Sequence, residues 1–168
     1  MDHETREVVR QTHEHIRRVG TILADVSGRL VLRAIHHDTS KFSDEEIGDF
    51  VRMTPKLRGL TYGSDEYKAA LAELGPALKH HYSCNSHHPE YWPGGVSDMS
   101  LLDLLETLCD WKAATERHAD GSIFNSLKHN RGRFGIPSPL HNVMVKTAAE
   151  LGWIAPGQVG ELLMSVEG

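Results

Sequence analysis

The histidines are the residues whose number and spacing most clearly indicate chemistry. The chain has 12 of them, and six form adjacent pairs, at His36-His37, His80-His81 and His87-His88. Imidazole is the commonest metal ligand among side chains and titrates closest to neutral pH. The first pair is followed directly by Asp38, so one short backbone segment offers a nitrogen and an oxygen ligand together. We therefore predict a metal site that includes this segment.

Four stretches of the chain resemble, in order, the motifs of the HD superfamily of metal-dependent phosphohydrolases. That family has an early His-x-x-Arg-Val, then an adjacent His-Asp followed by x-x-Lys, and an aspartate on a later helix. The corresponding residues here are His15, the doublet His37-Asp38 with Lys41, and Asp110. The segment KHHYSCNSHHPEYWPGG is similar to the histidine loop of the binuclear members, and HHDTSKF and NSHHPEYW resemble a small branch of the superfamily. The resemblance spans roughly residues 10 to 118 and carries over no specific substrate.

The resemblance implies a ligand set for one or two metal ions. Side chains two residues apart on a helix point about 200° apart, so His13 and His15 cannot face one ion, and the Arg-Val context favours His15. The predicted ligands are His15, His37, Asp38 and Asp110 for a first ion, with His81 and His88 holding or assisting a second. Mixed imidazole and carboxylate ligands suit Mn, Fe, Co, Ni or Zn better than Ca.

The reaction expected from this site is hydrolysis of a phosphate ester or anhydride by a metal-activated water. A bound divalent ion lowers the pKa of water from 15.7 towards about 7 and polarises a phosphoryl oxygen. The predicted catalytic residues are Asp38, Lys41 and Glu106, and the predicted substrate-binding residues are Lys41, His80, His87, Trp92, Arg131 and Arg133. The substrate would be a nucleotide or a similar small phosphorylated metabolite.

Structural alternatives exist for several of these residues. Lys41 would equally well tie its turn to the helix that follows, and Trp92 would anchor a long loop to the core. The arginines would simply be solvated. Asp103, which shares a predicted helix face with Glu106 and Asp110, would either support the acid chemistry of the site or belong to a solvated acidic stripe. The function also has two alternatives: an HD-type di-iron oxygenase, and a non-catalytic metal-dependent binding module.

Composition restricts the class of protein. Hydrophobic residues make up 39%, charged residues 24%, and the formal net charge is −5 with a pI near 6.2, which argues against a stable nucleic-acid complex. The sequence has no run of about 18 apolar residues and begins with charged side chains, so we expect a cytoplasmic protein. The two cysteines, Cys84 and Cys109, cannot form a disulfide framework. A homodimer through the terminal helices is an open expectation.

Helical spacing of apolar residues dominates the chain, and no segment alternates as a strand would. The prediction is one all-α domain, residues 1–168, an HD-like bundle of about seven helices, with the site core at about 10–118 and helices at 139–166 as cover. Ser43 and Glu46 fit a capping box for a helix near 44–53. Ser64-Asp65-Glu66 opens another helix, which is expected to kink at Gly75-Pro76 and to end near residue 82. The other predicted segments are helices at 4–26, 30–35, 98–117, 139–151 and 157–166, and loops or polar stretches at 54–63, 83–97 and 118–138.

Overall fold

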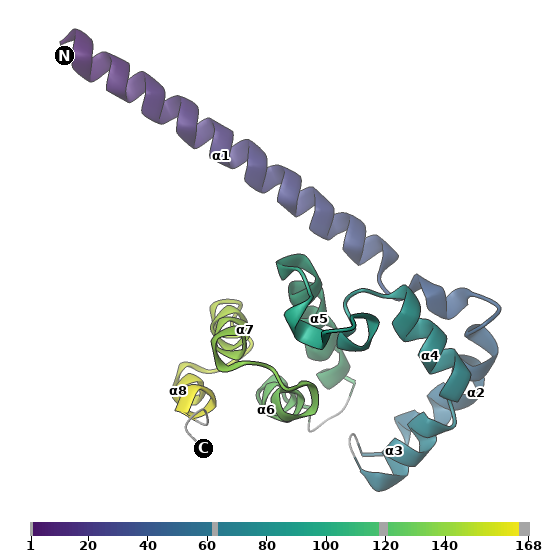
Figure 1. The fold of residues 1–168 in the computed structure, drawn as a ribbon. Helices are drawn as coiled ribbons and strands as arrows, with labels where there is room; N and C mark the ends of the chain where they lie inside the picture. Colours follow the sequence, from purple (N-terminus) through teal and green to yellow (C-terminus); the bar gives the residue numbers. More distant parts are fainter. Residues whose placement is uncertain (1, 62–63, 118–120, 165–168) are drawn as a thin grey trace. The chain divides into compact units, whose positions relative to one another are not determined.

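The computed structural model describes residues 2–61, 64–117 and 121–164, and every regular element within these ranges is helical (Figure 1). The α-helices are α1 (His3–His36), α2 (Ile47–Arg58), α3 (Asp65–Ala72), α4 (Gly75–Cys84), α5 (Leu101–Thr115), α6 (Ile123–Phe134), α7 (Ser138–Glu150) and α8 (Pro156–Met164). Three 3₁₀ turns join them: η1 (Thr39–Phe42), η2 (Pro89–Tyr91) and η3 (Gly95–Ser97). The all-α prediction is confirmed, with eight α-helices among the described residues instead of about seven. The chain divides into two units, 1–37 and 38–168.

The first unit is a single 34-residue helix, α1 (Figure 1). Its N-terminus is capped by Asp2, whose side chain accepts a hydrogen bond from the Thr5 amide at 2.7 Å. The prediction of two helices separated at Gly28 was wrong, because α1 passes through this residue. A glycine inside a helix costs only about 1 kcal/mol relative to alanine, which the well-formed turns on both sides offset.

Within the second unit, α2, α3 and α4 surround a small core. Met53, Ala70 and Leu74 are buried at its centre. Helix α3 begins at the predicted position, and Ser64 caps its N-terminus by accepting a hydrogen bond from the Tyr67 amide at 3.1 Å. In contrast, α2 begins after Glu46 and continues through Pro55, so the predicted loop at 54–63 starts only after Arg58.

The larger core of the same unit lies between α5, α6, α7 and α8 (Figure 1). These four helices follow one another in the sequence, and each packs against at least two of the others. Leu108, Leu127, Val145 and Ala148 are at most 1% exposed there. The predicted helix at 98–117 starts at residue 101, because a capping box at residues 100 and 103 fixes its first turn. The polar stretch predicted at 118–138 was wrong over 123–134, which form α6.

The reason α6 escapes detection is its composition. Four buried positions recur at helical spacing in α6, but two of them are polar, so the apolar pattern is incomplete. The four residues are Ile123, Ser126, Leu127 and Asn130. Gly135 ends the helix with φ of 58°, a conformation that glycine adopts without steric cost. The last helix ends at Met164, and residues 165–166 of the predicted helix lie outside the described residues. None of the described helices is both long and apolar enough to cross a bilayer.

His141 gives the larger core a testable pH dependence. It is fully buried on the face of α7 that carries Val145 and Ala148, and burial, followed by the charge of Arg131, lowers its pKa from 6.5. The unfolded chain therefore binds a proton at His141 more readily than the folded chain. The unfolding free energy should fall as pH decreases through about 6.5, with this group contributing a slope of up to about 1.4 kcal/mol per pH unit.

Urea denaturation at several pH values, with and without His141→Gln, measures this contribution. The variant should show a shallower loss of stability towards low pH than the unmodified protein. His129→Gln is the matched control, since His129 is exposed on α6. Equal slopes for the protein and the His141 variant would contradict the prediction.

Candidate metal centre

Asp38 occupies a special backbone position directly before η1. Its φ of 58° and ψ of 14° make it the one described non-glycine residue with positive φ. Aspartate and asparagine tolerate this left-handed conformation better than most side chains. The Asp38 carbonyl accepts a hydrogen bond from the Lys41 amide at 3.0 Å, which closes the turn. The turn fixes the direction of the Asp38 carboxylate.

Three histidines from α4 and the following loop gather around this carboxylate. Asp38 Oδ1 lies 3.2 Å from His81 Nε2 and 3.3 Å from His87 Nε2. His81 Nε2 also lies 3.0 Å from His88 Nε2. Asp38, His87 and His88 offer one ligand atom each, all within 4.8 Å of one another. We call Asp38, His81, His87 and His88 the ligand cluster.

Three distances within the ligand cluster match those between neighbouring ligands of a metal ion, and the group whose ligand atoms all lie within 4.8 Å of one another is Asp38, His87 and His88. Metal–nitrogen and metal–oxygen bonds of about 2.1 Å place neighbouring ligands about 3.0 Å apart in an octahedron and about 3.4 Å apart in a tetrahedron. The three measured separations, 3.0, 3.2 and 3.3 Å, fall within this interval. Hydrogen bonds between a charged imidazole and a carboxylate are shorter, at about 2.7–2.9 Å. The donor set, one carboxylate and three imidazoles, suits Mn, Fe, Co, Ni or Zn.

The protonation states in the cluster also favour a cation. Burial, then the neighbouring His87 and His81, lowers the pKa of His88 to about 3, so its ring is neutral near pH 7. Burial raises the pKa of Asp38, but the neighbouring His81, His87 and Lys41 bring it well below its ordinary range. An ionised carboxylate and a neutral imidazole are the forms that bind metals.

His87 is held in place from α5. Thr107 Oγ1 donates to the His87 carbonyl at 2.5 Å, and Ser86 Oγ donates to Asp103 Oδ1 at 2.6 Å. Trp92 Nε1 donates to the Ser86 carbonyl at 2.8 Å, and the Trp92 ring packs against the larger core. These contacts explain why the loop can present a buried histidine. Trp92 and Asp103 thus have structural contacts, Asp103 also forming the capping box of α5.

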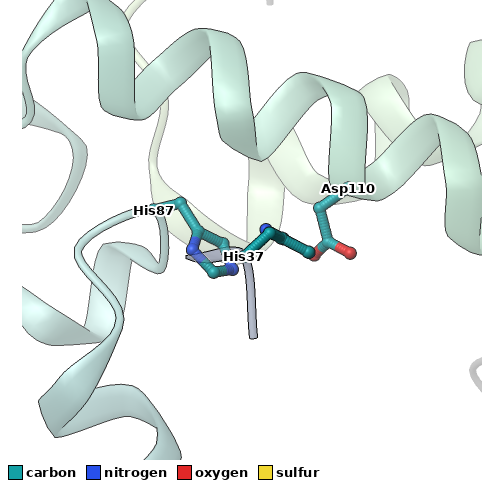
Figure 2. Close-up of side chains that lie close together, drawn as sticks. All are labelled: His37, His87 and Asp110. Atoms are coloured by element: carbon teal, nitrogen blue, oxygen red, sulfur yellow. The ribbon is translucent and has the colours of Figure 1, made fainter. Parts of the chain in front are cut away.

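Two acidic residues of α5 face the loop from one side of the helix, four residues apart. Glu106 Oε1 lies 3.2 Å from His87 Nδ1. Asp110 and His87 offer ligand atoms within 4.8 Å of each other (Figure 2). The spacing of four residues places both carboxylates on the same helix face. Glu106, predicted as catalytic, is therefore in contact with a histidine ring.

Glu46 is a member of the site that the sequence interpretation missed. Instead of capping its helix, its fully buried carboxylate lies 2.7 Å from His80 Nδ1 and 3.0 Å from His81 Nδ1. The capping-box prediction was wrong, because the Glu46 amide bonds to the Ser43 carbonyl and the side chain points inward. A signal was available: Glu46 shares its helix face with Phe50 and Met53 of the small core.

The remaining predicted residues are distributed differently. Lys41 Nζ lies 2.5 Å from Asp38 Oδ2 and sits over the Phe50 ring. Arg133 pairs with Glu90 at 3.0 Å, and Arg131 donates a hydrogen bond to Ser138 Oγ at 3.2 Å. These bonds are directed to residues outside the ligand cluster.

Two further predicted ligands, His15 and His37, belong to the first unit. One peptide bond joins His37, also drawn in Figure 2, to Asp38.

An open pocket is lined by residues of α4 and η2. Its lining includes Lys79, Tyr82 and Tyr91. The Tyr82 ring, which lines the pocket, packs against His88 of the ligand cluster with 4.9 Å between ring centroids. The pocket therefore offers two tyrosine rings and the ammonium group of Lys79.

A family model described as a family of unknown function (DUF5662) matches residues 4–152. The chain belongs to this family. No curated protein and no solved structure gave a significant match to the sequence. The matched range contains the whole ligand cluster together with Glu46, Glu106 and Asp110.

Proposed function

We propose that this protein is a metal-dependent phosphohydrolase that acts on a nucleotide or a similar small phosphorylated metabolite. The observation that carries the proposal is the ligand cluster. In it, His81 Nε2 and His87 Nε2 lie 3.2 and 3.3 Å from Asp38 Oδ1, and His88 Nε2 lies 3.0 Å from His81 Nε2. When bound, a divalent ion there would supply a water of lowered pKa and polarise a phosphoryl oxygen.

The ligand set combines the cluster with neighbouring groups. Asp110 lies close to His87, so it is proposed as a further ligand. His37 stays a ligand predicted from the sequence alone. Two carboxyl groups, those of Glu46 and Glu106, contact histidines of the cluster, and one lysine, Lys41, contacts Asp38. This excess of negative charge favours a divalent cation over an anion at the centre.

Substrate recognition is assigned to groups at the edge of the cluster. The Lys41 ammonium lies beside the Asp38 carboxylate with 31% of its side chain exposed, where it can neutralise a phosphate oxygen. The pocket beside Tyr82 would take the organic part of the substrate, with Tyr91 and Lys79 available to stack on a ring or pair with a second phosphate. These contacts suit a small molecule and leave the paired arginines of α6 outside the site.

The test is elemental analysis of protein purified without chelators, followed by anaerobic phosphate release from a nucleotide panel with Mn, Co, Ni, Fe and Mg. We expect near-stoichiometric transition metal and metal-dependent phosphate release. Lys41→Met should raise KM or lower kcat while leaving the metal content intact. Absence of bound metal under all conditions would contradict the proposal. Product formation only with oxygen would instead identify the oxygenase alternative.

A further inference from the structure

We infer that Glu46 is a positioning residue, which keeps a proton on Nδ1 of His81 so that Nε2 of the same ring faces Asp38. This inference rests on the proposed metal site for its purpose. Its geometric basis is independent: Glu46 Oε2 lies 3.0 Å from His81 Nδ1, and Asp38 Oδ1 lies 3.2 Å from His81 Nε2, on the opposite edge of the ring. A carboxylate therefore faces each nitrogen of one imidazole.

Burial makes the Glu46 contacts obligatory. The side chain is fully buried, and a buried carboxylate is costly unless hydrogen-bond donors surround it. Its two oxygens are approached by His80 Nδ1 at 2.7 Å and His81 Nδ1 at 3.0 Å. In each hydrogen bond from these rings to the carboxylate, the donor is the Nδ1–H group, so the geometry places a proton on both Nδ1 atoms.

Two other groups near His81 Nδ1 do not change this assignment. Asn85 Nδ2 and Ser40 Oγ both lie 3.1 Å from that nitrogen. The two amide hydrogens of Asn85 are directed to closer acceptors, Ser40 Oγ at 2.8 Å and the His81 carbonyl at 2.7 Å. A charge-assisted bond to Glu46 is also stronger than a bond between the neutral serine and imidazole.

The same order of groups recurs at the second histidine of the cluster. Glu106 Oε1 lies 3.2 Å from His87 Nδ1, and His87 Nε2 lies 3.3 Å from Asp38 Oδ1. Two carboxylate–imidazole pairs thus converge on one oxygen. Carboxylates that hold the far nitrogen of a ligand histidine typically change metal affinity by about 10- to 100-fold when removed. We assign that effect to Glu46 at His81.

The experiment compares Glu46→Gln and Glu46→Met with Glu45→Gln, which alters the exposed neighbouring glutamate. Gln keeps the shape of Glu but offers one acceptor and no charge, and Met offers no acceptor. Competition with a chelator should show Zn²⁺ affinity about 10-fold weaker for Gln and up to about 100-fold weaker for Met. The Glu45 variant should bind as the unmodified protein does.

A second readout does not depend on metal binding. Nitrogen-15 NMR of the metal-free protein at about pH 8.5, above the ordinary histidine pKa of about 6.5, should find His81 Nδ1 protonated. In Glu46→Met the proton should move to Nε2, towards Asp38. The inference would be overturned if both Glu46 variants kept the Nδ1 proton and bound Zn²⁺ with unchanged affinity. If the Met variant does not fold, the same two measurements on Glu46→Gln decide the matter. If the unmodified protein binds no metal but the proton moves as expected, the proposed function fails and the role of Glu46 stands.

Discussion

Asp38→Asn should weaken transition-metal binding by more than about 100-fold, beyond the effect typical of groups that only support a ligand. Metal-dependent phosphate release should disappear with it. The physical reason is that Asp38 Oδ1 is the common neighbour of His81 and His87, at 3.2 and 3.3 Å, and supplies the one negative charge among the four residues of the ligand cluster. Chelator competition and elemental analysis measure the first effect, and the nucleotide panel measures the second.

Asparagine is the informative replacement because it separates charge from backbone strain. Asp38 has φ of 58°, which asparagine tolerates and alanine does not. Asp38→Ala would combine ligand loss with a strained turn. Asp44→Asn is the matched control, since Asp44 is exposed a few residues further along the chain. Full metal occupancy in Asp38→Asn would eliminate the ligand cluster as the metal site.

His87→Gln should also reduce metal affinity by about 100-fold or more, whereas His80→Gln should reduce it by about 10-fold. The structural difference is that His87 Nε2 lies 3.3 Å from Asp38 Oδ1, while His80 Nδ1 lies 2.7 Å from Glu46, whose other oxygen contacts His81. Both residues were predicted from the sequence to contact the substrate, and the two roles give different outcomes. A histidine that touches only phosphate would raise KM and leave the metal content unchanged.

Metal affinity, metal content and the KM of the best nucleotide substrate should therefore be measured on both variants. His88→Gln serves as the comparison, because the sequence already favoured His88 as a ligand and its Nε2 lies 3.0 Å from His81 Nε2. If His87→Gln retains the metal with normal affinity and only KM rises, His87 belongs to the substrate site.

The sequence alone determined the local features of this protein. Apolar residues at helical spacing predicted an all-α chain, Ser64 predicted the start of α3, and the adjacent histidines marked α4 and its loop. The spacing of Glu106 and Asp110 placed both carboxylates on one face of α5. Each of these properties depends on residues within a few positions of one another, where backbone geometry dictates the outcome.

The tertiary structure decided which of these groups meet. Glu46 and His81 are 35 residues apart in sequence, so no helical period or motif could pair them. The local pattern of Ser43 and Glu46 instead predicted a capping box, which the structure does not have. The loop that places His87 beside Asp38 is held against α5 by hydrogen bonds from Thr107 to the His87 carbonyl and from Ser86 to Asp103. Such contacts depend on packing of separate elements around a shared core, whereas sequence periodicity reports only which face of each element is apolar.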